Sequence, residues 1–277
     1  MANYKDIHGS NIETVTSNPD NPVNGQVWYN STDQALRGFT SNPAGAWASG
    51  GNLNTGRSYM IGAGTQTSAL GSGGQGPPGS SVDNVEAYNG SSWTEVADLN
   101  NGRGRFTGTG IQTAAIACGG ETTGPPNVSK ANVETWNGSS WTETTDLNQA
   151  RQYVHTGGTY TSALTAGGLN PPGTTRGESE SWNGSAWTEV ADINTSDGQR
   201  TVFGQDNSNA LAVGTNLNES WNGSSWTEVT DLSTARGITG SGRSPSGSGL
   251  VFGGASYSAA TEEWTAPVET TVTFTTS

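Results

Sequence analysis

The sequence predicts an all-β protein built from repeated four-stranded units. Two landmarks recur along the chain in a fixed order: glycine pairs, and pairs of aromatic residues separated by an Asn-Gly turn. A period of about 40–50 residues is typical of propellers and solenoids, in which each repeat forms one supersecondary unit. The 277 residues include 10 Trp, and bulky aromatic side chains at regular spacing argue against the alternative of a disordered chain.

The aromatic motif is the clearest repeat. Val-Glu-x-(Tyr/Trp)-Asn-Gly-Ser-Ser-Trp-Thr-Glu occurs at 85–95 and 133–143, with related copies around 182–187 and 221–226. Glu and the first aromatic residue are two positions apart, so their side chains share one face of a strand. Asn-Gly is a strong hairpin signal, because both residues of a two-residue type I′ turn need positive φ. We therefore expect the third and fourth strands of each unit to pair antiparallel.

Glycine pairs are expected to end the second strand of each unit. They stand at 73–74, 119–120, 167–168 and 253–254, and Val213-Gly214 is a lapsed copy, so five units result. The first strands of the second and third units are expected at 106–110 and 153–159, and their second strands at 113–119 and 162–167. The second strands are rich in small residues, which suit strands crowded around a narrow axis.

One Asp and one Arg lie in each connection between units. They are Asp98 with Arg103, Asp146 with Arg151, Asp192 with a displaced Arg200, and Asp231 with Arg236, and Arg57 belongs to the same series. A residue required once per repeat serves the repeat, so we expect these charges to cap turns and pair between units, not to form a ring of binding groups. The same reasoning applies to Glu86, Glu134, Glu180, Glu219 and Glu262. The paired Trp residues would suit a sugar platform, but their strict period favours packing between units.

Arg, glycine pair, aromatic residue and Trp in this order resemble the kelch repeat. The resemblance covers residues 57–264 and implies a β-propeller of four-stranded blades. The fourth unit departs from the pattern, because Val213-Gly214 replaces Gly-Gly and Arg200 stands three residues late. We therefore expect a local irregularity in that unit.

Closure of the ring has two interpretations. Strands are expected in the N-terminal segment at 11–17, 27–29 and 35–39 and at Trp47, and a final strand at 268–275. Six blades result if the N-terminal strands form a degenerate blade beside the five clear repeats. Five blades result if the strand at Trp47 completes the last blade instead. The expected organisation is an N-terminal segment, 1–26, partly extended, and a single propeller, 27–277, closed by strands from both ends.

The segment at 18–31, Asn-Pro-Asp-Asn-Pro-Val-Asn-Gly-Gln-Val-Trp-Tyr-Asn-Ser, resembles a hairpin common in tail-fibre and other virion proteins of bacteriophages. This resemblance implies a non-enzymatic structural or adhesion protein of the tail, a fibre or the capsid surface, localised in the virion after assembly in the host cytoplasm. The implied partners are other virion proteins, a host-surface glycan and further copies of the chain. The alternatives are a carbohydrate-binding lectin and a glycan-active enzyme.

Composition argues against several other partners. The net charge of −13 would repel phosphate backbones, so nucleic acid is not expected to bind. No apolar run approaches about 18 residues, so membrane insertion is not expected, and the N-terminus lacks a secretory signal profile. The single cysteine, Cys118, rules out a disulfide framework within the chain and is expected to act as a small buried hydrophobe.

No catalytic residue, metal site or cofactor is predicted. The two histidines, His8 and His155, belong to no recognisable catalytic or metal motif. Some kelch-like propellers are copper oxidases that use a Tyr joined to a Cys and two His, but Cys118 lies in an apolar strand without matching surroundings. Nearly all acidic residues occupy repeat-equivalent positions, which a single glycosidase site would not require.

The loops that follow the glycine pairs form the candidate binding face. With strands running alternately up and down, these loops share one face with the Asp-to-Arg connections, and the Asn-Gly turns lie on the other. Loops on a rigid scaffold are where recognition is common, although prolines can also simply stiffen exposed connections. The candidate residues are Pro77, Pro78, Pro125, Pro126, Lys130, Pro171, Pro172 and Arg176.

Overall fold

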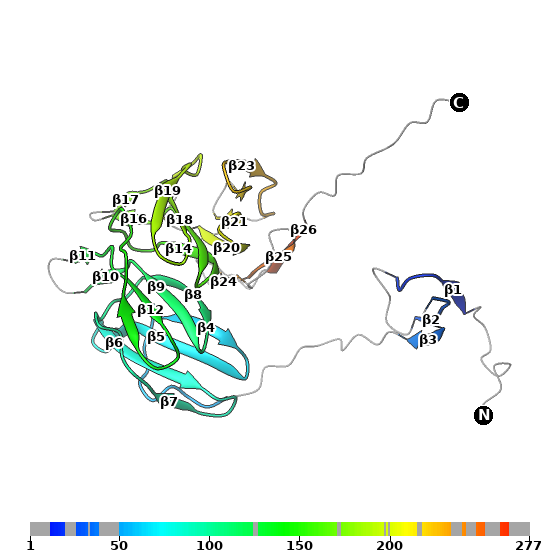
Figure 1. Cartoon of the computed structure of the whole chain (residues 1–277), viewed down its shortest axis with the longest axis horizontal. Coiled ribbons are helices and arrows are strands. Elements are labelled where there is room, and N and C mark those ends of the chain that lie inside the picture. Colours follow the sequence, from blue (N-terminus) through cyan, green and yellow to red (C-terminus); the bar gives the residue numbers. More distant parts are fainter. Residues whose placement is uncertain are drawn as a thin grey trace. The chain divides into compact units, whose positions relative to one another are not determined.

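The computed structural model describes residues 12–19, 26–32, 34–38, 50–123, 127–170, 173–196, 198, 200–214, 218–233, 240–241, 248–252 and 261–265. The chain divides into two compact units, Met1–Ser49 and Gly50–Ser277. Every regular element in the described ranges is a β-strand (Figure 1). The expectation of an all-β protein is therefore confirmed. Within these ranges, no helix has the length and apolar character needed to cross a membrane.

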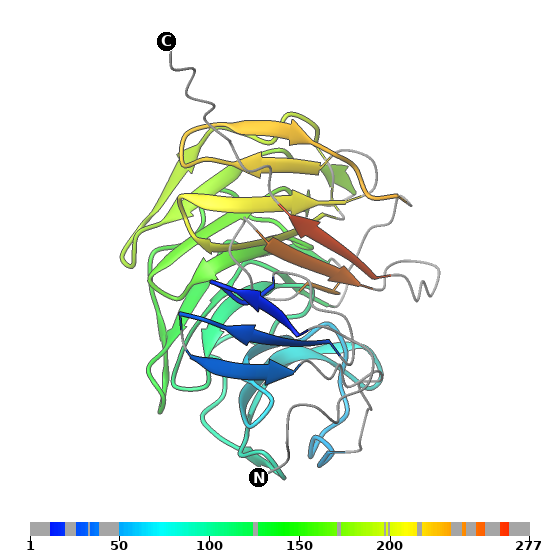
Figure 2. The same ribbon diagram turned by 90° about the vertical axis from the view of Figure 1, so that its right-hand side faces the viewer.

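The first unit contains one three-stranded sheet (Figure 2). β1 (Glu13–Val15) pairs in parallel with β2 (Val27–Asn30), which pairs antiparallel with β3 (Ala35–Gly38). The Oδ1 atom of Asn18 accepts a hydrogen bond of 3.1 Å from Trp28 Nε1, which ties the segment before the turn to the sheet. These strands confirm the three expected ones, whereas Trp47 lies outside the described residues. Membership of this sheet in a common ring with the second unit stays a prediction.

The second unit contains four successive four-stranded antiparallel sheets, each with its strands in chain order. Sheet 1 consists of β4 (Ile61–Thr65), β5 (Ser68–Gly76), β6 (Ser80–Tyr88) and β7 (Trp93–Glu95). Sheet 2 consists of β8 (Thr107–Ile111), β9 (Ala114–Cys118), β12 (Val133–Trp136) and β13 (Trp141–Glu143). Sheet 3 consists of β14 (His155–Thr159), β15 (Ser162–Ala166), β18 (Ser179–Trp182) and β19 (Trp187–Val190). Sheet 4 consists of β20 (Thr201–Asp206), β21 (Asn209–Val213), β22 (Asn218–Trp221) and β23 (Trp226–Val229).

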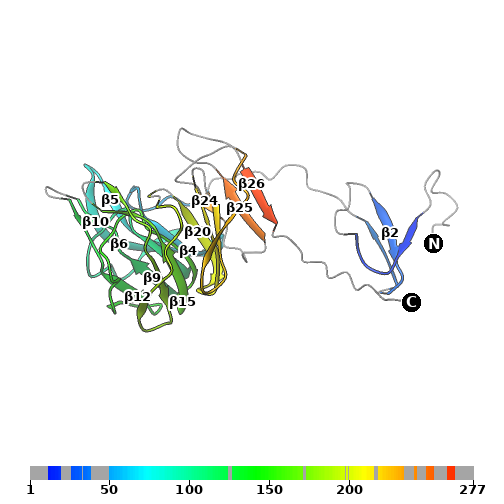
Figure 3. The ribbon, with the colours of Figure 1, turned by 90° about the horizontal axis from the view of Figure 1, so that it is seen from above.

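Two short hairpins follow the glycine pairs of sheets 2 and 3. They are β10 (Glu121–Thr122) with β11 (Val128–Ser129), and β16 (Leu169–Asn170) with β17 (Thr174–Thr175). β10 lies next to β6 of sheet 1 (Figure 3). The backbone N–H of Thr123 donates a hydrogen bond of 2.9 Å to Ser81 Oγ, which joins this hairpin to the neighbouring sheet.

The turns between third and fourth strands differ from the expected type. The loop has four residues, Asn-Gly-Ser-Ser in sheet 2, and only its glycine, Gly138, has positive φ (95°). The Oδ1 atom of Asn137 accepts hydrogen bonds of 2.9 Å from the backbone N–H groups of Ser139 and Ser140. The predicted hairpin is confirmed, but the two-residue turn was wrong, because Asn serves as a side-chain acceptor and does not adopt positive φ.

The aromatic pairs pack between successive sheets, as predicted. Trp136 and Trp141 of sheet 2, with ring centroids 5.5 Å apart, share a buried cluster with Ala63 and Leu70 of sheet 1. The Trp pairs of sheets 3 and 4 make equivalent clusters with the sheets that precede them. Cys118 is buried in one of these clusters, which confirms its expected role. The hydrophobic core therefore consists of layers between sheets.

The first strands of the four sheets lie nearest one another. β4 neighbours β8, β8 neighbours β14, and β14 neighbours β20, whereas β7 and β19 lie at the rim (Figure 1). A Cβ atom added to Gly157 in β14 would lie 2.8 Å from the backbone carbon of Phe203 in β20. Glycine is therefore needed at this close approach of two backbones.

The repeated Arg pairs with the repeated Glu of its own sheet, which corrects the expected pairing between units. Arg103 pairs with Glu134, and both side chains are buried. The equivalent pairs are Arg57–Glu86 at 3.1 Å, Arg151–Glu180 at 2.6 Å and Arg200–Glu219 at 2.5 Å. The Asp residues do cap backbone as expected: Asp98, Asp146 and Asp231 accept hydrogen bonds from the N–H groups of Val85, Val133 and Asn218.

The fourth unit contains an irregularity, but it lies away from Arg200 and Val213-Gly214, and sheet 1 has a similar one between Ser72 and Gly74. The register between β20 and β21 shifts between Gly204 and Asp206, which is a local bulge. Arg200 nevertheless reaches Glu219, so the displaced arginine keeps the contact made in the other sheets.

A fifth sheet of three strands follows. It consists of β24 (Gly240–Ser241), β25 (Ser248–Phe252) and β26 (Thr261–Thr265). Trp264 packs against a buried cluster of Phe203, Leu211 and Val213 from sheet 4, as the Trp residues of earlier sheets do. Arg236, the glycine pair at 253–254 and the expected strand at 268–275 lie outside the described residues.

Candidate functional site

Three equivalent residues stand where the chain enters the first strands of sheets 1, 2 and 3. Tyr59, Arg105 and Tyr153 each lie two residues after the repeated Arg, and each has φ of 53°. Left-handed backbone at a non-glycine residue costs about 1–2 kcal/mol. The backbone N–H of Arg105 donates to Tyr59 O at 3.3 Å, and that of Tyr153 donates to Arg105 O at 2.9 Å. These hydrogen bonds hold the three chain segments side by side. Because Tyr153 has left-handed and not extended backbone, the first strand of the third unit begins at His155 and not at Tyr153.

The side chains of these residues form a tyrosine–arginine cluster, defined as Tyr59, Arg105 and Tyr153. The Cζ atom of Arg105 lies 5.1 Å from the centroid of each tyrosine ring. The two rings are 6.4 Å apart and perpendicular, at 88°. The guanidinium thus contacts two aromatic rings, a favourable cation–π arrangement. Tyr59 is 49% exposed, so this cluster reaches the surface.

A buried carboxylate holds Arg105 in place. Arg105 Nη1 donates a hydrogen bond of 2.6 Å to Glu121 Oε1, and Gln75 Nε2 donates to the same atom at 3.2 Å. Glu121 is fully buried, and desolvation raises the pKa of its carboxyl, although Arg105 and Gln75 act in the opposite direction. Glu121 balances the charge of Arg105 locally.

A pocket adjoins this cluster. It has a volume of about 310 Å³ and is lined by Gly56, Arg57, Ser58, Gln75, Gly76, Pro77 and Gly79. We call it the Pro77 pocket. Ser58 and Gln75 exchange backbone hydrogen bonds of 3.0 and 2.7 Å, and Gln75 also contacts Glu121. Gln75 therefore links the pocket to the carboxylate that holds Arg105, although no residue of the tyrosine–arginine cluster lines the pocket.

Arg57 differs from its repeat equivalents at this pocket. Nη1 of Arg103 donates a hydrogen bond of 2.6 Å to the carbonyl of Asn132, whereas the buried Nη1 atom of Arg57 has no hydrogen-bond partner; its Nε atom also lacks one, as does that of Arg151. Buried donors without partners are costly, and such groups are found where water or a ligand completes a site. Arg57 lines the Pro77 pocket, but its unpartnered donors are buried and are not exposed in the pocket.

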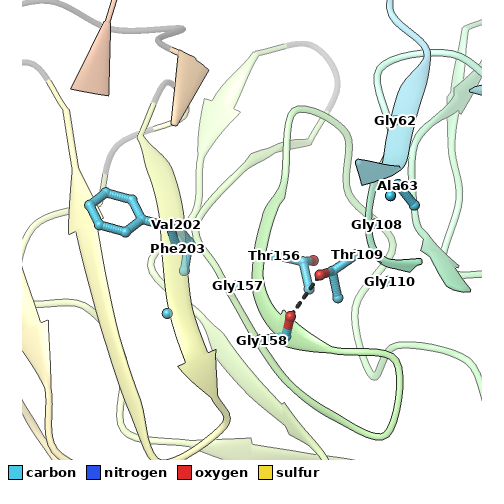
Figure 4. Close-up of a pocket in the computed structure, with 12 residues that line it drawn as sticks. Gly62, Ala63, Gly108, Thr109, Gly110, Thr156, Gly157, Gly158, Val202 and Phe203 are labelled. Atoms are coloured by element: carbon cyan, nitrogen blue, oxygen red, sulfur yellow. Dashed lines mark hydrogen bonds between the residues drawn. The ribbon is translucent and has the colours of Figure 1, made fainter. Parts of the chain in front are cut away.

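A second cavity lies where the first strands converge (Figure 4). Its volume is about 280 Å³, and each of β4, β8, β14 and β20 contributes three lining residues. Thr109 Oγ1 donates a hydrogen bond of 2.7 Å to Gly158 O across it. Glycine backbone dominates the lining, so this cavity offers few side chains for recognition.

The candidate binding residues predicted from the sequence do not all lie at this site. Pro77 lines the pocket, and Pro78 follows it in the same loop. Lys130 and Arg176 occupy equivalent positions, where their backbone N–H groups donate to Gly120 O and Gly168 O, and Arg176 also pairs with Glu178 at 3.3 Å. Pro125, Pro126, Pro171 and Pro172 lie outside the described residues.

Sequence reasoning missed Tyr59, Arg105, Tyr153 and Glu121. The signal was present as a departure from the repeat: the position two residues after the repeated Arg carries Tyr, Arg and Tyr in three successive units. Likewise, Glu121 follows a glycine pair at a place where the neighbouring units have Gln75 and Leu169.

The remaining reactive side chains that the structure describes are buried or half-buried. Burial raises the pKa of the Cys118 thiol, so the thiolate is disfavoured. Desolvation lowers the pKa of His155 to about 4, which keeps this half-buried imidazole neutral at pH 7. In the ranges that the structure describes, no group of three or more His, Cys, Asp or Glu residues is arranged to hold a metal. His8 lies outside them.

Comparison with known proteins adds no analogy for this site. No protein-family model matches the chain, and no curated protein matches it.

Proposed function

We propose that this chain is a kelch-like β-propeller that acts as a non-enzymatic binding module of a bacteriophage virion. The observation that carries the binding role is the tyrosine–arginine cluster with its adjoining pocket, placed on the loop face of a rigid set of sheets. Exposed aromatic and arginine side chains held by surrounding contacts are typical of recognition sites. The virion location rests on the resemblance of residues 18–31 to phage hairpins.

The propeller itself is supported by the way each sheet covers its neighbour. In sheets 2 to 4 the first aromatic residue of each pair is buried, whereas Tyr88 and Trp93 of sheet 1 are only half-buried. In a closed ring, a preceding blade would cover the face of sheet 1 that carries Tyr88 and Trp93. We propose six blades, with the N-terminal strands contributing one, and five blades as the alternative. An electron-microscopy reconstruction viewed along the axis would count them.

The virion proposal is tested by locating the chain in purified particles. Immunogold labelling with antibodies against the full chain should mark the tail, a fibre or the capsid surface. Particles that carry no label, although the protein is present in infected cells, would contradict the proposal.

A free carbohydrate-binding protein is the second candidate, and the exposed Tyr59 ring favours it. A glycan-active enzyme is not proposed. Incubation with host capsule should accordingly release no oligosaccharide.

A further inference from the structure

We propose that the tyrosine–arginine cluster and the Pro77 pocket together bind a neutral oligosaccharide. This inference rests on the proposed binding function and names its ligand class.

The charge of the site favours an uncharged ligand. Arg105 is its exposed cation, and Glu121 neutralises it through a contact of 2.6 Å. Glu121 itself is fully buried, so no carboxylate of this pair is exposed to attract a cation. The net charge of −13 adds a long-range repulsion against anions.

The exposed groups of the cluster can contact both the C–H groups and the hydroxyl groups of a sugar ring. Tyr59, at 49% exposure, offers an aromatic surface on which the C–H groups of a pyranose can pack. Arg105 is 25% exposed and only its Nη1 atom is used by Glu121; its Nε atom is buried, so Nη2 is the nitrogen left to donate to hydroxyl oxygens. Contacts with Tyr59, Tyr153 and Glu121 fix the guanidinium, which reduces the entropy lost on binding.

The Pro77 pocket provides a place for an adjacent sugar unit. Its volume of about 310 Å³ is at the small end of ligand pockets, which suits one ring of a chain and not a large ligand. The Arg57 side chain is fully buried, so its unpartnered donors are not exposed in this pocket. The lining of this pocket includes Pro77, Ser58 and Gln75 beside its glycines, and a sugar ring can pack against it. Cluster and pocket share Gln75 as a neighbour, so one oligosaccharide can occupy both.

A protein or peptide partner fits the described surface less well. Stable protein interfaces need roughly 1,000 Å² with an apolar centre. The exposed large hydrophobic residues described in the second unit are Tyr59, Ile111, Val128 and Tyr160. Only Tyr59 belongs to the cluster, and Ile111 and Tyr160 lie at turns on the opposite face. A single aromatic residue is enough for a sugar but not for a protein interface.

The test begins with the full chain on an array of neutral hexose and N-acetylhexosamine oligosaccharides, with uronic-acid oligosaccharides and a peptide library beside them. Binding to neutral oligosaccharides is expected. The strongest neutral binder is then titrated by calorimetry against the wild type and variants. Tyr59→Ala should weaken its binding about tenfold or more, and Tyr59→Phe should keep it within about threefold, because the ring is retained.

Tyr160→Ala is the matched control, because Tyr160 is also an exposed tyrosine, at 40%, but on the face of the hairpin turns. It should bind as the wild type does. Arg105→Lys keeps a cation beside Glu121 but loses the planar fork, and should weaken binding about fivefold or more. Thermal melting of each variant separates loss of a contact from loss of folding.

Three results would overturn the inference: binding only to acidic oligosaccharides or peptides, no binding to any neutral oligosaccharide, or equal losses in Tyr59→Ala and Tyr160→Ala. These outcomes are independent of the virion proposal. A labelled particle whose protein binds no neutral sugar contradicts only the ligand class, and a sugar-binding chain absent from particles contradicts only the location.

Discussion

Arg103 and Arg105 are two residues apart, yet they serve different purposes. Arg103 pairs with Glu134 in a fully buried contact that recurs in the other sheets, and its Nη1 and Nη2 groups are used within the sheet. Arg105 pairs with Glu121, is 25% exposed, and contacts two tyrosine rings that other sheets contribute. The difference teaches that in this chain a residue present in every unit stabilises its own sheet, whereas residues that depart from the repeat form the candidate site.

The largest expected effect separates these two arginines. Arg103→Met should lower the free energy of unfolding by about 3–5 kcal/mol, because it leaves Glu134 buried without its partner. Arg105→Met should cost less, about 1–2 kcal/mol, because Arg105 is partly exposed, so that water can replace its guanidinium, and Gln75 still donates a hydrogen bond to Glu121. Urea denaturation of both variants measures the difference. Equal losses of stability in the two variants would contradict the distinction between an arginine of the repeat and the arginine of the candidate site.

The repeat could be predicted from the sequence because its signals are local. The Asn-Gly turns, the glycine pairs and the small-residue second strands each specify a strand or a turn within a few residues of their own position. One correction was local, since the turn at Asn137 has four residues and not two. The other arose where a contact spans the sheet. Arg103 and Glu134 are 31 residues apart, and only the strand order places them together.

The candidate site was not predicted for the same physical reason. Tyr59, Arg105 and Tyr153 lie just before the first strands of three different sheets, and they meet because these strands converge. Sequence reasoning instead favoured prolines and cations in the longer loops. Of those described, Pro77 proved to line the pocket, and Arg176 pairs with Glu178.

A second comparison tests how tightly the first strands converge. Gly157→Ala should destabilise the protein by about 2 kcal/mol, because the new Cβ would lie 2.8 Å from the backbone of Phe203. Gly62→Ala, at another position that lines the same cavity, should change stability by no more than about 0.5 kcal/mol, because no atom lies within 4 Å of its Cβ. Thermal melting of the two variants would show the difference. Similar losses would contradict the described packing of β14 against β20.

The third comparison concerns His155 and its repeat equivalents Thr107 and Thr201, which begin the first strands of sheets 2 and 4. Burial lowers the pKa of His155 to about 4 from an ordinary value of 6.5. The folded state therefore resists protonation, so the stability associated with neutral His155 is fully present above about pH 6.5 and is lost as the pH falls toward 4.

His155→Thr should remove this dependence. Between pH 7 and pH 4 the wild type should lose on the order of 1–2 kcal/mol relative to the variant, allowing for its partial exposure. Above pH 7 the difference between the two proteins should be constant. Denaturant midpoints measured at several pH values check both statements, and a difference that does not vary with pH would show that His155 titrates normally.

The smallest expected effect distinguishes the two roles within the hairpin turn. Asn137→Ala should cost about 1 kcal/mol, because its Oδ1 atom accepts hydrogen bonds from the N–H groups of Ser139 and Ser140. Asn137→Asp keeps an acceptor and should cost less than about 0.5 kcal/mol. Asn137→Gly should resemble the alanine variant, because the native backbone at this position does not need positive φ. If Asn137→Gly instead kept full stability while Asn137→Asp lost it, the turn would depend on backbone freedom, as a two-residue type I′ turn does.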